Sequence, residues 1–261
     1  MKALAARRRH PAAFVILLLL GLLMTGGAYS FFAPGSAQAE AGSSSQDIET
    51  GKKLFMANCT TCHGANATGT PDGPSLVGVG AAAVDFQVGT GRMPLPQQNV
   101  QAKRNKVQFS DTEIKQMAAY VASLGPGPAV PDQKYITAEG ANLARGGDIF
   151  RVNCAMCHNY AGSGGALTRG KFAPPLRGIE GKHIYEAMLT GPQSMPVFND
   201  QNITPEEKRD VIAYLHELDK ANNTGGHTLG SFGPVADGFF LWLIAIPIMI
   251  GSAVWLGRKA A

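Results

Sequence analysis

Two long apolar runs lie near the ends of the chain. Residues 12–32 carry no charged side chain and centre on FVILLLLGLLM, and residues 239–257 read FFLWLIAIPIMIGSAVWLG. Each run is close to the roughly 20 apolar residues that cross a bilayer as a helix. Between them, apolar positions recur with helical spacing, and no segment alternates as a half-buried strand does. The pattern predicts a mainly α protein with an N-terminal apolar segment and one C-terminal transmembrane helix.

Basic side chains flank both runs. The tip 1–11 holds Lys2 and Arg7-Arg8-Arg9 and no acid, and the tail 258–261 holds Arg258 and Lys259 and no acid. A nucleic-acid binder concentrates its basic residues on a folded domain, so that class is excluded. By the positive-inside rule, both ends lie in the cytoplasm, and the part between the runs lies on the extracytoplasmic face of the cell membrane.

The first run has two interpretations. Basic residues, an apolar core and then Ala37-Gln38-Ala39 before Glu40 also describe a cleavable secretory signal. A retained segment would make the protein multi-pass, whereas cleavage would leave the second run as its anchor in membrane lipid. Both interpretations export the middle of the chain.

Three segments have the composition of linkers, namely 33–46, 125–137 and 222–238. They are small, polar and rich in Pro or Gly, so they cannot bury enough apolar surface to fold alone. They leave two units, 47–124 and 138–221.

The two units repeat each other. GPSLVGV in the first corresponds to APPLRGI in the second, and TGRMP corresponds to TGPQSMP. Such a repeat indicates one structural unit that occurs twice. The matched positions before the cysteines are Gly51, Phe55 and Asn58 in the first unit and Gly146, Phe150 and Asn153 in the second.

Each unit closes on a predicted helix. Ser110-x-x-Glu113 and Thr204-x-x-Glu207 are capping-box signatures, and Pro205 suits a first helical position. Shorter helices are predicted over DIETGKKLFMANC and EGANLARGGDIFRVNC. The apolar stripes of the closing helices are Ile114, Met117, Ala118, Val121 and Leu124 in the first unit, and Val211, Ile212, Tyr214, Leu215 and Leu218 in the second.

Cysteine occurs only within CTTCH and CAMCH. Cys-x-x-Cys-His is the attachment motif of c-type haem. Two thiols one helical turn apart add to the porphyrin vinyl groups, and the adjacent histidine ligates the iron. The sequence therefore predicts two covalently bound haem c groups, one on Cys59 and Cys62 with His63, the other on Cys154 and Cys157 with His158.

Three other uses of these cysteines fit less well. A single Cys₄ zinc site would join pairs 95 residues apart in separate units, each with an adjacent histidine. A thioredoxin-like redox pair needs a strand–helix context. A structural disulfide needs no following histidine and is strained across two intervening residues.

The sixth ligand of each iron is expected to be a methionine, because a thioether raises the reduction potential and suits electron transfer. Met93 and Met195 each precede a proline in a Gly-rich loop, 30 and 37 residues after His63 and His158. The remaining candidates lie on helical patterns, inside the cysteine motif, or have no counterpart in the other unit: Met56, Met117, Met156, Met188, His183, His216 and His227.

Each unit resembles a class I cytochrome c domain. GKKLFMANCTTCHG, GPSLVG, GRMP and AAYVASL follow the order of that family, as do GGDIFRVNCAMCHN, APPLRG, QSMP and IAYLHEL. The resemblance implies that the carbonyls of Pro74 and Pro174 accept a hydrogen bond from the ligating imidazoles, which orients each ring. It also implies that Phe55 and Phe150 pack between crossing helices.

From about residue 5 to 258 the chain resembles the dihaem cytochrome c subunit of the actinobacterial cytochrome bc1 complex. GPSLVGVGAAAVDFQVGTGRMP and GGALTRGKFAPPLRGI carry this resemblance, whereas the polar insert 97–108 is foreign to the generic c fold. The resemblance implies a subunit of quinol–cytochrome c reductase that works beside cytochrome b. It would carry single electrons from the Rieske iron-sulfur protein to an aa3-type oxidase.

Two other functions share these motifs. A dihaem peroxidase needs one iron with a displaceable sixth ligand, whereas both units offer a Met-Pro loop. A dihaem subunit of another membrane dehydrogenase or oxidase would have the same motifs, and only the whole-chain resemblance opposes it. Haem potentials, the order of the haems and the stoichiometry of the complex do not follow from the sequence.

Overall fold

A computed structural model describes residues 11–32, 44–220 and 238–260. The basic tip, Ala37-Gln38-Ala39, His227 and most of the linkers 33–46 and 222–238 lie outside these residues. Helix α2 lies in one compact part of the chain, and the residues from 39 onward, which include both repeat units, form another.

The apolar runs form helices α2 (Pro11–Phe32), η4 (Leu241–Ala245) and α12 (Ile246–Ala260). The segment Gly238–Lys259 has a mean hydropathy of 2.2, and among the described residues it is the one helix long and apolar enough to cross a membrane. Its apolar side chains are exposed on every side, as lipid contact requires. The apolar stretch of α2, Ala12–Gly27, is shorter.

The π-helical turn η4 ends two residues before Pro247. Proline has no N–H to donate to the carbonyl four residues earlier, that of Leu243, and its ring crowds that carbonyl. A widened turn relieves the crowding, and in a membrane helix such a local adjustment is tolerated.

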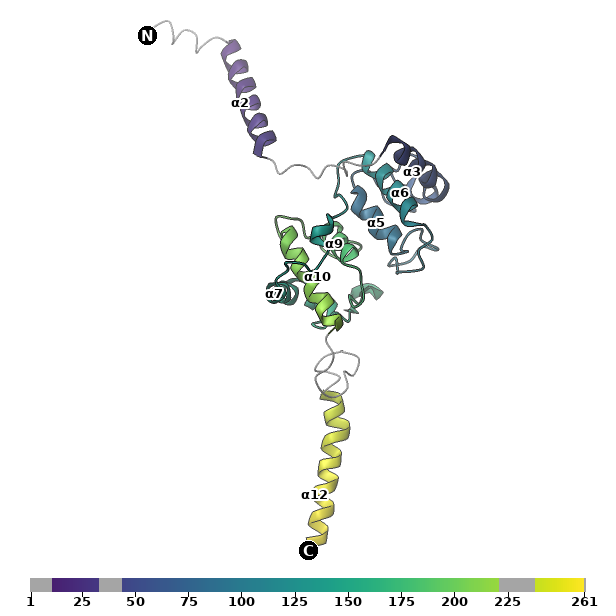
Figure 1. The fold of residues 1–261 in the computed structure, drawn as a ribbon, viewed down its shortest axis with the longest axis vertical. Helices are drawn as coiled ribbons and strands as arrows, with labels where there is room; N and C mark the ends of the chain where they lie inside the picture. The colour runs from purple at the N-terminus through teal and green to yellow at the C-terminus, as the bar shows by residue number, and fades with distance from the viewer. Residues whose placement is uncertain (1–10, 33–43, 221–237, 261) are drawn as a thin grey trace, which may run out of the picture. The chain divides into compact units, whose positions relative to one another are not determined.

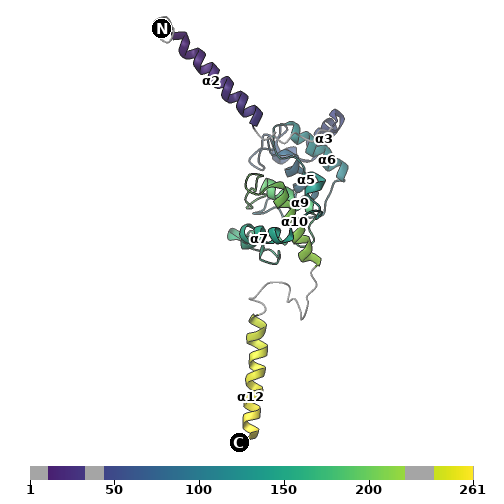
Figure 2. The same cartoon turned by 60° about the vertical axis from the view of Figure 1, so that its left-hand side comes forward.

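Two helical units lie between the apolar runs. The first helical unit consists of α3 (Ser45–Asn58), α4 (Thr60–His63), α5 (Gly80–Gly89) and α6 (Asp111–Ser123). The second contains η1 (Gln133–Tyr135), α7 (Leu143–Asn153), α8 (Ala155–His158), β1 (Gly165–Ala166), η2 (Thr168–Gly170), β2 (Phe172–Ala173), α9 (Gly181–Thr190) and α10 (Pro205–Lys220). The mainly α architecture and its repeat are confirmed, with one short antiparallel β1–β2 pairing. Figures 1 and 2 show α3 against α6 and α7 against α10.

Both predicted capping boxes form. Ser110 N donates to Glu113 Oε2 at 2.8 Å, and Glu113 N donates back to the Ser110 hydroxyl. Thr204 and Glu207 make the same reciprocal pair. A further box between Ser44 and Asp47 starts α3 at Ser45, two residues inside the predicted linker 33–46. The sequence analysis did not predict this start because the third helical position holds aspartate, which is shorter than the glutamate or glutamine of the usual capping box.

A glycine sets the helix crossing in each unit. A Cβ at Gly51 would lie 1.9 Å from the carbonyl oxygen of Gln116 in α6, so only glycine lets α3 approach so closely. Four residues later, Phe55 is 1% exposed and its ring lies 5.3 Å from that of Tyr120. In the second unit Gly146 and Phe150 repeat this arrangement, and the Phe150 and Tyr214 rings are 5.6 Å apart. The predicted apolar stripes of α6 and α10, the last helices of the two units, pack into these cores.

The sequence analysis did not predict helices α5 and α9. Helix α5 lies between α6 and α9 and is buried on both sides, so its sequence GAAAVDFQVG has no polar face to reveal a helical period. Helix α9 buries His183 and Glu186 among its apolar residues, which breaks the pattern.

Candidate haem-binding sites

Each cysteine motif folds as one helical turn. The His63 N–H donates to the Cys59 carbonyl at 2.9 Å, and the His158 N–H donates to the Cys154 carbonyl at 2.9 Å. The first cysteine of each pair ends α3 or α7, which the glycine crossing holds in place. In both units, therefore, one backbone turn of the same form carries two thiols and an imidazole.

Both imidazoles are buried and oriented by a proline carbonyl. His63 Nδ1 lies 2.7 Å from Pro74 O, and His158 Nδ1 lies 2.9 Å from Pro174 O. A carbonyl only accepts, so Nδ1 carries the proton and Nε2 keeps its lone pair for a metal. Burial lowers the pKa of His158 against the opposing effect of the Pro174 hydrogen bond, so this ring is neutral at pH 7. These are the contacts that the class I resemblance implies.

The thiols do not have the lowered pKa of a redox-active pair. Burial, and then the charge of the neighbouring thiol, raises the pKa of Cys59 and of Cys154 to about 11. Redox-active thiols have a lowered pKa. The single cluster of metal-ligating side chains in the described part of the chain contains no cysteine, so the two pairs do not converge on a Cys₄ site.

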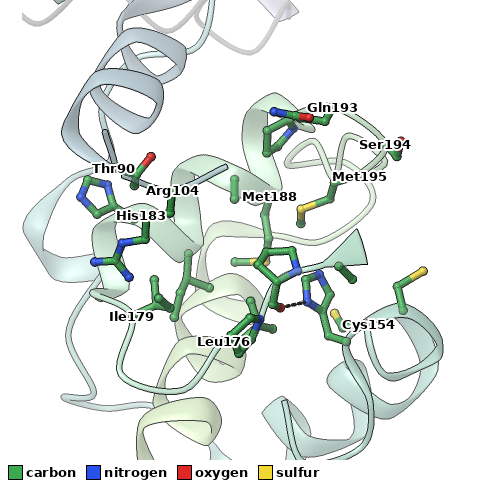
Figure 3. Close-up of a pocket in the computed structure, with 18 of the residues that line it drawn as sticks. Thr90, Arg104, Cys154, Leu176, Ile179, His183, Met188, Gln193, Ser194 and Met195 are labelled. Carbon is green, nitrogen blue, oxygen red and sulfur yellow. Dashed lines mark hydrogen bonds between the residues drawn. The ribbon is translucent and has the colours of Figure 1, made fainter. Parts of the chain in front are cut away.

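The second unit encloses a cavity of about 490 Å³ beside Cys154, Cys157 and His158. Figure 3 shows Cys154 at the end of α7 and Met195 on the loop after α9 projecting into it. Most of the remaining wall is apolar, including Phe150, Leu176 and Met188. A thiol pair and an imidazole on one wall, a thioether across from them and an apolar surround fit a haem c group.

The first unit buries its imidazole as well, and its candidate methionine packs against the core. His63 is 8% exposed, and Met93 packs against the cluster that contains Phe55 and Val88. Two of the methionines that were not expected to bind iron lie in different surroundings: Met117 is buried in this core, whereas Met156 is 92% exposed. In the second unit, Met188 and His183 line the cavity, and His216 Nε2 donates to the Ile179 carbonyl at 3.1 Å.

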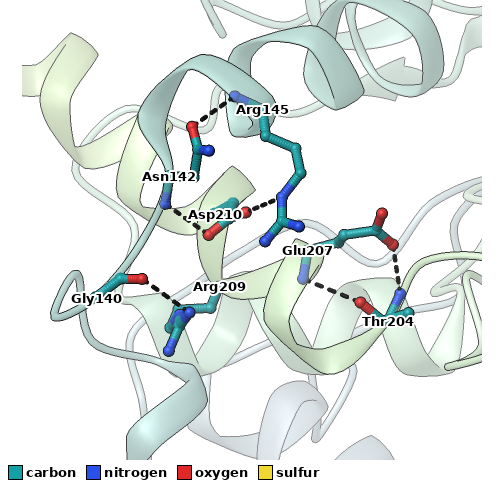
Figure 4. Close-up of polar contacts among 7 residues, drawn as sticks. All are labelled: Gly140, Asn142, Arg145, Thr204, Glu207, Arg209 and Asp210. Carbon is teal, nitrogen blue, oxygen red and sulfur yellow. Dashed lines mark hydrogen bonds and ion pairs between the residues drawn. The ribbon is translucent and has the colours of Figure 1, made fainter.

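An ion pair between a half-exposed arginine and a buried aspartate holds α7 on α10 (Figure 4). The Asp210 carboxylate is fully buried and accepts from the Arg145 guanidinium and, at 2.8 Å, from the Asn142 backbone N–H. Asn142 also caps α7 through Arg145 N. Because Cys154 ends α7, this network positions the cysteine motif.

A second polar cluster lies between the two units. Asp85 of α5 and His183 and Glu186 of α9 are all buried, with one donor atom of each within 4.8 Å of the others. Lys182 Nζ lies 2.7 Å from Asp85 Oδ1. Burial, and next the Asp85 charge, raises the pKa of Glu186 to about 9. With Glu186 protonated, the charge of Lys182 balances that of Asp85. The sequence analysis missed this cluster, and the one signal that could have indicated it is the rarity of acidic residues within apolar helical stretches.

Comparison with known proteins agrees with this geometry. Residues 48–125 match the family described as cytochrome c, and residues 141–215 match cytochrome c oxidase, cbb3-type, subunit III. The cytochrome bc1 complex cytochrome c subunit of Mycobacterium tuberculosis is 46% identical over 261 residues, covering 97% of this chain and 93% of the relative. That of Corynebacterium diphtheriae is 41% identical, covering 99% of both chains. This chain belongs to the family of cytochrome bc1 complex cytochrome c subunits.

A more distant relative is the cbb3-type cytochrome c oxidase subunit FixP of Bradyrhizobium diazoefficiens, at 24% identity over 64% of this chain. The two family matches confirm two cytochrome c-type domains, and Gly238–Lys259 is a C-terminal apolar helix suited to membrane anchoring. The subunit is therefore a membrane cytochrome c that carries electrons.

Proposed function

We propose that the subunit holds two covalent haem c groups and carries single electrons within a quinol-oxidising bc1 complex. Cys59 and Cys62 bind the first haem, with His63 and Met93 as axial ligands. Cys154, Cys157, His158 and Met195 serve the second. The electrons come from the Rieske iron-sulfur protein, beside cytochrome b, and pass to an aa3-type oxidase.

The duplicated imidazole geometry is the observation that supports this most strongly. Each unit supplies a buried histidine whose Nδ1 is held by a proline carbonyl, directly after a thiol pair. The oriented imidazole acts as a permanent ligand, and a methionine loop faces it in the second cavity. Two six-coordinate irons suit electron transfer and leave no open position for a peroxide. These residues hold and orient the cofactor and exclude water from it.

Membership of another oxidase is the second candidate, because the second unit matches the cbb3-type subunit family. The identity of 24% to FixP is well below the 46% shared with the bc1 subunits. The bc1 assignment therefore has the stronger support.

Membrane attachment keeps both haem units near their redox partners. We place them on the extracytoplasmic face, where c-type haem is attached, with Arg258 and Lys259 in the cytoplasm. Tethering makes each electron handover effectively intramolecular and raises the local concentration of the carrier. Protease added to intact spheroplasts should digest both helical units, and protected units would contradict this topology.

The test is purification of the membrane complex through a tag on this chain. Denatured wild-type chain washed with acidic acetone should retain two haems, and replacement of either Cys59 and Cys62 or Cys154 and Cys157 by Ala should leave one. Cytochrome b, the Rieske protein and the oxidase should co-purify. Stoichiometric zinc without haem, or a different set of partners, would overturn the proposal.

A further inference from the structure

Residues of the first unit complete the cavity of the second. Thr90, Arg92 and residues 101–104 line it together with Cys154 and Met195. Residues 101–104 belong to the polar insert 97–108, which the generic c fold does not contain. The insert of one unit therefore forms part of the wall of the other unit's cavity.

Two reciprocal amide pairs hold the insert there. The Gln101 side chain donates to the Phe172 carbonyl at 2.8 Å and accepts from the Phe172 N–H at 2.9 Å. The Gln193 side chain, two residues before Met195, accepts from the Ala102 N–H at 3.1 Å and donates to the Ala102 carbonyl at 3.2 Å. Each unit thus contributes one glutamine that binds the backbone of the other, and residues 103 and 104 follow directly.

The charge of the cavity wall is entirely positive. No aspartate or glutamate lines the cavity, whereas Arg92, Lys103, Arg104 and Arg177 do. Arg177 is paired with Asp219 at 2.7 Å. In the described part of the chain, no carboxylate lies within ion-pair distance of the other three. An apolar cavity with unbalanced cations at its wall is complementary to an apolar ligand that carries anionic groups.

Two of these cations also lie close together. Arg92 stacks on the Phe86 ring at 4.6 Å, and burial, followed by the charge of Arg104, lowers the pKa of its guanidinium. Like charges that converge without an anion cost free energy, and an anionic ligand would remove that cost. Figure 3 shows Arg104 and His183 on the part of the wall away from Cys154.

We infer that Arg104 and Lys103, carried by the insert of the first unit, bind the propionate carboxylates of the haem held by the second unit. This rests on the proposed attachment of haem to Cys154 and Cys157. Haem c combines an apolar macrocycle with two carboxylates, which matches the apolar wall and its cationic rim. An arginine fork binds a carboxylate through two parallel hydrogen bonds, so Arg104 is the stronger contact.

The contact makes the first unit a determinant of the second haem's reduction potential. Positive charge near a haem favours the ferrous state, which carries one positive charge fewer than the ferric state. Loss of the Arg104 charge therefore lowers the potential of the second haem and leaves that of the first unchanged.

The test is a redox titration of the purified full-chain complex carrying Arg104→Gln, Arg104→Lys or Lys106→Gln. Lys106 lies in the same insert and does not line the cavity, so its variant is the matched charge control. A variant without Cys154 and Cys157 identifies the potential of the first haem. R104Q should shift the one-electron equilibrium of the second haem at least threefold toward the ferric state, or about 28 mV at 59 mV per tenfold. R104K should recover part of the shift, and K106Q should cause none.

A second variant tests the positioning of the insert. Gln101→Ala combined with Gln193→Ala should lower the same potential with all charges intact, and the propionate bending band in the resonance Raman spectrum should shift. Unchanged potentials in R104Q and in this double variant, at two haems per chain, would overturn the inference and leave the proposed function standing. Wild-type chain without covalent haem would instead overturn the proposed function.

Discussion

Gly146 of α7 lies against the backbone of Asp210 in α10, where a Cβ would come within 2.1 Å of the Asp210 carbonyl oxygen. Neither atom belongs to a flexible side chain, so an added methyl group must separate the two helices. The residues that follow Gly146 on α7 lead to Cys154. The crossing and the cysteine motif are therefore mechanically connected.

Gly146→Ala should destabilise the second unit although alanine favours helix. Alanine improves helix propensity by about 1 kcal/mol, whereas overpacking against backbone costs about 3 kcal/mol or more. The thermal midpoint of the full chain in detergent should fall, and the second haem should be incorporated poorly. Gly147→Ala on the same helix meets mainly the Tyr214 ring and should cost less. Equal midpoints for wild type and G146A would show that the crossing is not tight.

Asp210→Asn should also loosen α7 from α10. The substitution replaces a fully buried carboxylate, which accepts from Arg145 and Asn142, by an amide whose NH₂ cannot accept. A loss of about 3 kcal/mol in the free energy of unfolding is expected, measured by urea titration. Asp148→Asn removes an exposed ion pair with Arg151 on the same helix and should cost almost nothing.

Glu186→Gln should flatten the pH dependence of stability. In the folded protein the pKa of Glu186 is raised to about 9 by burial and by Asp85, so the folded state retains a proton that the unfolded state releases above about pH 4.5. The free energy of unfolding therefore falls as pH rises from about 4.5 to 9, by up to about 1.4 kcal/mol per pH unit.

Glutamine cannot ionise, so E186Q should lose this fall while Lys182 still pairs with Asp85. Thermal midpoints at pH 5, 7 and 8.5 measure the effect, with the exposed Glu180→Gln as control. Parallel midpoint curves for E186Q and wild type would show that Glu186 is ionised in the folded protein.

Met195→His tests the proposed sixth ligand of the second iron. Imidazole keeps the iron six-coordinate but lacks the soft thioether that stabilises the ferrous state. The potential of the second haem should fall by on the order of 0.2 V. The sulfur-to-iron charge-transfer band of the oxidised protein should lose half of its intensity.

Electron delivery to the oxidase should then stall with haem content intact, whereas Met156→His, at a 92% exposed position, should change nothing. An unchanged spectrum in M195H would assign the sixth position to another group or leave it open, and peroxidase chemistry would become the better interpretation.

The sequence predicted those parts of the fold that have local signals. Capping boxes marked the starts of α6 and α10, and the repeat aligned Gly51 with Gly146 and Phe55 with Phe150. The packing of these residues could be predicted from their spacing. Positions four apart lie on the same face of a helix, so the glycine at the crossing and the phenylalanine ring face the same partner helix. The cysteine motifs predicted haem attachment from the sequence because a single helical turn contains both thiols and the histidine.

Contacts between segments distant in the chain left no such signal. Nothing near Gln101 indicated that its amide would bind Phe172, 71 residues later, or that Glu186 would be buried beside Asp85. Helix α5 was missed because burial on two sides removes the polar face on which recognition by period depends. These contacts are tertiary, and they also connect the two units.

Helices α5 and α9 occupy the same place in the two copies of the repeat, and they pack against each other. Contact between equivalent surfaces is the hallmark of a two-fold homodimer. Because both copies lie in one polypeptide, this surface does not have to be self-complementary. Lys182 now meets Asp85, although counting back from the matched Thr90 and Thr190 aligns Asp85 with Tyr185 and Lys182 with Ala82. Two separate copies of either unit could not form this pair, so it specifies an asymmetric contact that a symmetric dimer of one unit could not contain.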